Sequence, residues 1–200
     1  MKWFVPAAVL AFFVASAAAA QERDAPATPE AREAMAEFAR CVASRSPDKT
    51  RATLRMDFTT SAYRQSLRAL ADTNRDCLRG RATLRAGGLP FAAALAEALI
   101  HDRRQPLNVR LVRAATVPAP TYAPSDRIAM CVARSDADNT AALLLAPIAS
   151  GAETGAAKAL GVAVHRCSAP RVRVDLDQYA LRAILATASF RLLTAAEVAQ

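Results

Sequence analysis

Apolar side chains recur at helical spacing along most of this chain. Met35, Phe38 and Val42 fall at i, i+3 and i+7, which places all three on one face of a helix. Thr28 and Pro29 precede this stretch, a combination typical of a helix start because the hydroxyl caps free backbone N–H groups. The pattern therefore predicts an amphipathic helix that begins directly after Thr28.

The same spacing predicts further helices along the chain, at residues 47–56, 60–77, 90–100, 128–133, 137–146, 152–166 and 177–192. Two short segments, residues 82–86 and 172–176, are expected to be extended. In the second of them Val172, Val174 and Leu176 alternate with polar residues, as in a strand. The abundance of Ala, the best helix former, points the same way as the spacing. We expect an all-α fold with at most one short strand pair.

The chain resembles itself at an offset of 90 residues. Residues 38–43 align with residues 128–133 without a gap, and each segment contains one Cys. An Asp-x-Thr sequence follows at the same distance in both, at 48–50 and at 138–140. Fixed-period similarity of this kind indicates repeated structural units. We interpret the chain as a tandem duplication of a unit of about four helices.

This interpretation gives the organisation of the whole chain. We expect a signal peptide, a first helical unit, a Pro-containing linker, a second helical unit and a short tail at residues 1–20, 21–104, 105–124, 125–193 and 194–200, respectively.

The four cysteines are expected to form disulfides. Cys41 and Cys77 are as far apart along the chain as Cys131 and Cys167. Four cysteines allow three pairings, and the sequence does not choose among them. The duplication favours the pairs Cys41–Cys77 and Cys131–Cys167, because a single ancestral unit could form only the pairing within one copy.

The N-terminus has the features of a secretory signal peptide. Lys2 precedes an apolar run, and Ala18–Ala20 supply the small residues that signal peptidase needs, with cleavage before Gln21. An uncleaved membrane anchor is the alternative, and no second apolar run is long enough to span a bilayer. We expect a periplasmic or secreted protein, a compartment in which disulfides persist.

Composition and charge narrow the possible partners. The chain is 53% apolar and 22% charged, which excludes collagen-like and disordered classes, and its net charge is +8. Several arginines could bind an anionic polymer, or they could simply form a solvated face. Aromatic residues are only 6%, so stacking on nucleic-acid bases is not expected. The candidate anion-binding residues are Arg51, Arg55, Arg64, Arg68, Arg75 and Arg79.

Catalytic and metal-binding motifs are absent from the sequence, and we predict no cofactor. His101 and His165 are the only histidines, and both are expected near helix ends as surface cations. A zinc site built from Cys131, His165, Cys167 and an acidic residue is an alternative without the usual close ligand spacing. A non-enzymatic protein is the first expectation.

Residues 141–146 are apolar on nearly every side, where the first copy has Arg51 and Arg55. A helix of this kind is normally buried. We expect it to pack against the first unit, with a covered partner as the alternative.

The repeated Cys-Val-Ala, Asp-x-Thr, Cys and Ala/Leu-rich pattern resembles exported proteins of GC-rich Gram-negative bacteria that have no known activity. The resemblance implies no catalytic residues. We predict an exported helical binding or interaction protein of the bacterial envelope, with an unknown envelope protein or an anionic polymer as partner. The alternatives are an envelope enzyme whose site lies at the junction of the copies, and an electrostatic binder of anionic glycolipid.

Overall fold

A computed structural model describes residues 28–78, 88–101, 105–168 and 176–199. Within these ranges the chain is helical and contains no strands, so the all-α class is confirmed. The predicted extended segment 82–86 and most of 172–176 lie outside the described residues, as does the predicted signal peptide. The helices are α2 (Pro29–Arg45), α3 (Pro47–Arg55), α4 (Ser61–Thr73), the short 3-10 helix η1 (Arg75–Cys77), α5 (Gly88–His101), α6 (Leu107–Ala114), α7 (Pro124–Ser135), α8 (Ala137–Leu145), α9 (Gly151–Ala159), α10 (Gly161–Cys167) and α11 (Gln178–Val198).

Several helices begin where the sequence places a capping residue. The Thr28 hydroxyl accepts a hydrogen bond from the Ala31 N–H, and Thr60 caps α4 in the same way. Asp177 caps α11 by accepting from the Ala180 N–H at 2.7 Å. These caps satisfy N–H groups that have no acceptor within their own helix.

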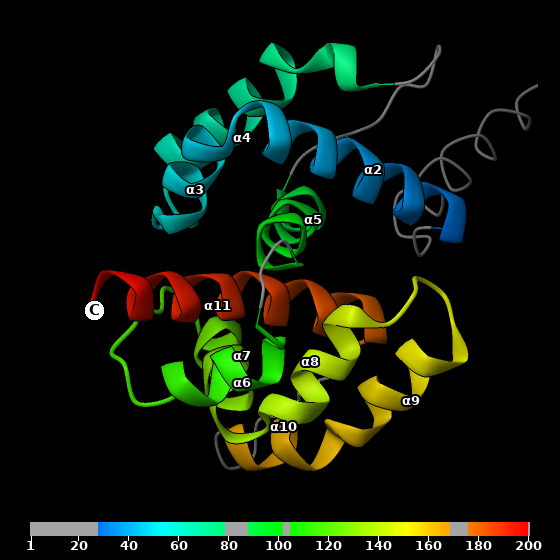
Figure 1. Cartoon of the computed structure of the whole chain (residues 1–200), viewed down its shortest axis with the longest axis vertical. Coiled ribbons are helices and arrows are strands. Elements are labelled where there is room, and N and C mark those ends of the chain that lie inside the picture. Colours follow the sequence, from blue (N-terminus) through cyan, green and yellow to red (C-terminus); the bar gives the residue numbers. More distant parts are fainter. Residues whose placement is uncertain (1–27, 79–87, 102–104, 169–175, 200) are drawn as a thin grey trace, which may run out of the picture.

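Helices α5 and α11 form the centre of the molecule. In Figure 1, α5 is seen almost end-on between α2 and α11, and α6 to α10 lie on the other side of α11. Phe91 and Leu95 of α5 and Leu185 and Leu192 of α11 have almost no exposed surface. We call α2 to α5 the first half and α6 to α11 the second half. The buried apolar side chains of both halves belong to one continuous cluster. Burial of this shared surface holds the halves together.

The bounds of corresponding helices also recur at the offset of 90. Helix α3 corresponds in both of its ends to α8, and the first residues of α4 and α5 correspond to those of α9 and α11. Each half contains its own disulfide, Cys41–Cys77 between α2 and η1 and Cys131–Cys167 between α7 and α10. These are the two expected pairs, while the duplication as an origin stays a prediction.

Two segments differ from the sequence-based expectation. The segment 105–124, interpreted as a linker, contains α6, whose Leu107 and Leu111 are buried against α7, α8 and α11. Helix α8 is buried as expected, but α6, α7, α9 and α11 cover Leu143 and Leu144, so its main contacts are not with the first unit. Both differences have one cause: α6 packs against α8, so residues 105–124 are not only a linker and α8 is covered from within its own half.

Within the described ranges, no helix combines the length and the apolar character that crossing a membrane requires.

Candidate binding site between the two halves

An apolar cavity of about 340 Å³ lies between the halves. Its walls come from the end of α3, from α4 and the loop before it, from the starts of α5 and α7, and from the middle of α11. The apolar wall comprises Leu54, Phe58, Tyr63, Leu67, Leu89 and Ile184, and the polar lining comprises Arg64, Arg68, Ser125, Asp126, Thr187 and Arg191. This volume is within the range of small-molecule sites, which combine apolar walls with a few polar groups.

Arg191 of α11 is the buried cation of this apolar cavity. The residue is only 4% exposed, and its Nη2 donates to Asp126 of α7. Its guanidinium also lies over the rings of Phe58 and Tyr122, at 5.6 and 5.8 Å from their centroids. Asp126 accepts a second hydrogen bond from the Tyr122 N–H at 3.0 Å. The arrangement fixes a positive group at the edge of an apolar wall.

Two exposed arginines, Arg64 and Arg68, lie at the mouth of the apolar cavity with Leu89, which is 40% exposed. Inside, burial raises the pKa of Tyr63 to about 12, although the charge of Arg191 opposes this shift. Tyr63 is therefore neutral near pH 7. The charged groups that line this cavity are three guanidiniums and one carboxylate, which leaves an excess of positive charge.

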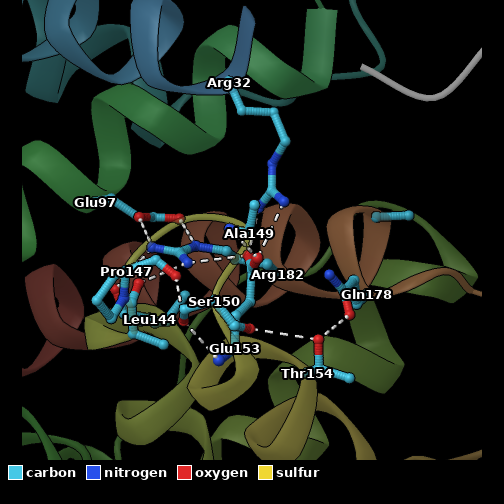
Figure 2. Close-up of polar contacts among 12 residues, drawn as sticks. Arg32, Glu97, Leu144, Pro147, Ala149, Ser150, Glu153, Thr154, Gln178 and Arg182 are labelled. Atoms are coloured by element: carbon cyan, nitrogen blue, oxygen red, sulfur yellow. Dashed lines mark hydrogen bonds and ion pairs between the residues drawn. The ribbon is translucent and has the colours of Figure 1, made fainter. Parts of the chain in front are cut away.

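A second cavity, of about 410 Å³, lies between α2, α5, the loop after α8 and the start of α11, and we call it the charged cavity. A network of buried ion pairs forms one wall (Figure 2). Glu153 of α9 accepts hydrogen bonds from both Arg32 of α2 and Arg182 of α11. Glu97 of α5 pairs with Arg182 through both carboxylate oxygens, at 2.8 and 2.7 Å. Since Arg32 and Glu97 belong to the first half, the network joins the two halves.

The carboxylate of Glu153 is fully compensated although it has no exposed surface.

 Burial acts to raise its pKa, but hydrogen bonds from Arg32, from the Ala149 N–H and from Arg182 outweigh burial, so the pKa of Glu153 lies below its usual range. Burial likewise acts to lower the pKa of Arg182, and the hydrogen bonds and charge of Glu97 more than reverse the effect. The charged forms of Glu153 and Arg182 are therefore stabilised by their neighbours.

The two cavities between the halves are lined by corresponding positions. Lining residues of the charged cavity match those of the apolar cavity at the offset of 90: Ala36 with Asp126, Ala94 with Ile184, Glu97 with Thr187, His101 with Arg191, Ile148 with Phe58, and Tyr179 with Leu89. Glu153 of the network corresponds in the same way to Tyr63. One position therefore holds a compensated ion-pair network, and its counterpart holds an apolar wall.

The predicted anion-binding arginines that the structure describes lie on different elements. Arg64 and Arg68 of α4 line the apolar cavity, whereas Arg51 and Arg55 lie on α3. Arg75 is exposed and pairs with Asp72 at 2.6 Å, and Arg79 lies outside the described residues. Anion binding by Arg64 and Arg68 stays a prediction.

The histidines have separate surroundings. His101 lines the charged cavity, and its Nε2 donates to the Leu144 carbonyl oxygen at 3.0 Å, since a carbonyl can only accept. His165 is exposed on α10. The disulfide between Cys131 and Cys167 occupies both thiols, which removes the ligands of the alternative zinc site. Among the residues that the structure describes, no group of three or more metal-ligating side chains is suitably placed.

The sequence patterns do not single out five buried charged residues, Arg32, Asp126, Glu153, Arg182 and Arg191. Arg182 and Arg191 are charged residues within the Ala- and Leu-rich stretch of α11, and this was the one available signal. Their partners are far away along the chain, with separations of 121 residues for Arg32–Glu153 and 65 for Arg191–Asp126. Local periodicity carries no information about such pairs.

Comparisons with family models, with curated proteins and with solved structures gave no match for this chain.

Proposed function

We propose that this protein is a non-enzymatic binding protein of the bacterial envelope that holds the apolar part of a small molecule in the apolar cavity. The observation that carries the proposal is the composition of this cavity, whose walls are mainly apolar and whose volume is about 340 Å³. Sites for small molecules are typically concave and apolar, with few polar groups that orient the ligand.

The position of the apolar cavity also supports binding. Its lining residues come from both halves, with Leu67 and Leu89 from the first and Ile184 from the second. A ligand in this place would contact both halves and would stabilise their association, because any molecule that binds only the folded state shifts the unfolding equilibrium.

The disulfides support an oxidising compartment for this binding. Both bonds join helices within one half, and the described residues include no free cysteine. Such bonds are typical of exported proteins and rare in the cytosol. Together with the predicted signal peptide, they favour the periplasm or the cell exterior as the place of action.

An uncharged fluorescent probe, N-phenyl-1-naphthylamine, tests the proposal on the disulfide-bonded protein. We expect saturable binding at one site, and we expect Leu89→Trp to block it by filling the mouth of the apolar cavity. Val112→Trp is the matched control, because Val112 is 62% exposed on α6 and lines neither cavity. Thermal unfolding would check that both variants fold.

Absence of saturable binding to the wild-type protein would show that the proposed function is wrong. Equal binding by the two tryptophan variants, both folded, would show that the probe does not occupy the apolar cavity.

A further inference from the structure

Helix α11 carries two buried arginines whose surroundings differ. Arg182 is 5% exposed and uses all three guanidinium nitrogens, donating to Glu97, to Glu153 and to the carbonyl oxygens of Leu144 and Ala146. Arg182 lines the charged cavity, and each of its guanidinium nitrogens has at least one acceptor within the protein. The hydrogen-bonding capacity of Arg182 is therefore used within the protein.

Arg191 is equally buried but is not saturated. Among the described residues its guanidinium donates one hydrogen bond, from Nη2 to Asp126, and its Nε is buried without an acceptor. A guanidinium has five N–H donors, and a buried donor without an acceptor costs free energy. Arg191 thus has a capacity for acceptors that the described residues do not fill, and it lines the apolar cavity.

The charges around the two arginines show the same contrast. Neighbouring glutamates raise the pKa of Arg182 above its ordinary value despite burial. For Arg191, burial lowers the pKa, and the charge of Asp126 only partly offsets this effect. A further negative group beside Arg191 would be stabilised by a cation that the protein compensates incompletely.

From the incompletely bonded Arg191, the apolar wall beside it and the arginines at the mouth, we infer that the ligand of the apolar cavity is a single-chain amphiphile with an anionic end group. The chain lies against Leu67, Leu89 and Ile184, and the anionic group accepts hydrogen bonds from Arg191. Arg64 and Arg68 attract the ligand to the mouth of the cavity. This inference rests on the proposed function and adds the chemical class of the ligand.

Competition against the fluorescent probe separates the two proposals. The competitors share one alkyl chain and differ at one end: dodecan-1-ol, dodecanoate, dodecyl phosphate and dodecylammonium. We expect both anions to bind about tenfold to a hundredfold more tightly than the alcohol, as for a charge-assisted hydrogen bond, and the ammonium more weakly than the alcohol. The tighter of the two anions identifies the end group.

Two variants test the role of Arg191. In Arg191→Met/Asp126→Asn the buried pair is replaced without leaving an unpaired charge, and we expect dodecan-1-ol to bind as before while the preference for anions disappears. Arg113→Gln is the control, because it removes an exposed arginine of α6 that lines neither cavity. Only a small change in affinity is expected from this control.

A measurement on the wild-type protein does not depend on the folding of a variant. With ¹⁵N-labelled arginine, dodecanoate should shift the Nε–H resonance of Arg191 and dodecan-1-ol should leave it nearly unchanged. Equal affinities for the alcohol and the anions would overturn the anionic class and leave the proposed function standing. An undiminished anion preference in the folded double variant, or an unmoved Arg191 resonance in the anion complex, would also overturn it. Failure of the probe and of every competitor to bind would overturn both proposals.

Discussion

Removal of the Glu153 carboxylate should destabilise the protein strongly. This side chain has no exposed surface, and it accepts hydrogen bonds from Arg32, from Arg182 and from the Ala149 N–H. In Glu153→Ala these donors lose their acceptor inside the molecule. Arg182 keeps its bidentate partner Glu97, whereas Arg32 loses both of its hydrogen bonds to a carboxylate while its side chain stays only 7% exposed.

The size of the expected loss of stability follows from this difference between Arg182 and Arg32. Breaking a buried ion pair by removing one partner costs about 3–5 kcal/mol, because the other charge is left uncompensated. Since only Arg32 loses its whole charge partner, we expect about 3 kcal/mol, near the lower end of that range. A typical domain is stable by about 5–15 kcal/mol, so the loss is a large fraction of the total.

Urea unfolding at pH 7, with the disulfides intact, measures this loss. Arg75→Ala is the control, because the Arg75–Asp72 pair is exposed and should contribute little. The double variant Arg32→Met/Glu153→Leu should recover part of the loss, since apolar replacement of a buried pair is often tolerated. A Glu153→Ala variant no less stable than Arg75→Ala would refute the view that the network joins the halves.

Three further predictions concern titration and cross-linking. The pKa of Glu153 is lowered in the folded state, so its contribution to stability is complete above its ordinary value and is lost as the pH falls through the folded value. The difference in melting temperature between wild type and Glu153→Gln should therefore shrink on acidification below about pH 4.5. Tyr63, with a pKa of about 12, should ionise at a higher pH than an ordinary tyrosine in an ultraviolet titration referenced to Tyr63→Phe. The contribution of neutral Tyr63 to stability should decline as the pH rises from about 10 through its folded-state pKa of about 12. Cys41→Ser/Cys77→Ser should lower the free energy of unfolding by at most about 3.8 kcal/mol, and non-reduced peptide mapping of the wild type should recover this disulfide.

Local signals in the sequence were sufficient for much of the fold. Capping residues such as Thr28 and Asp177 mark helix starts, and apolar residues at i, i+3 and i+7 mark the buried faces. The equal spacing of the cysteines favoured the disulfide pairs that the structure contains. Helix α6 was missed because the flanking prolines suggested a linker, although Leu107, Leu111 and Ala114 already follow helical spacing.

The candidate site could not be predicted in the same way. Arg64 and Arg68 were selected for charge, and only the arrangement of α4, α5, α7 and α11 around one space shows that they border an apolar cavity. Arg191 and Asp126 were not selected, because a charged residue in an Ala-rich helix gives no sign of which distant element it faces. Local sequence determines where helices form, whereas the composition of a cavity depends on contacts between them.

The matching positions of the two cavities have a consequence for how such a site can change. In a symmetric dimer of identical chains, every substitution is present twice, so both copies of an interface cavity must keep the same chemistry. A single chain that contains both halves has no such constraint. Glu97 and Glu153 can fill one position with ion pairs while Thr187 and Tyr63 leave the other apolar. Covalent continuity thus lets one cavity secure the association of the halves and leaves the other open to selection for a ligand.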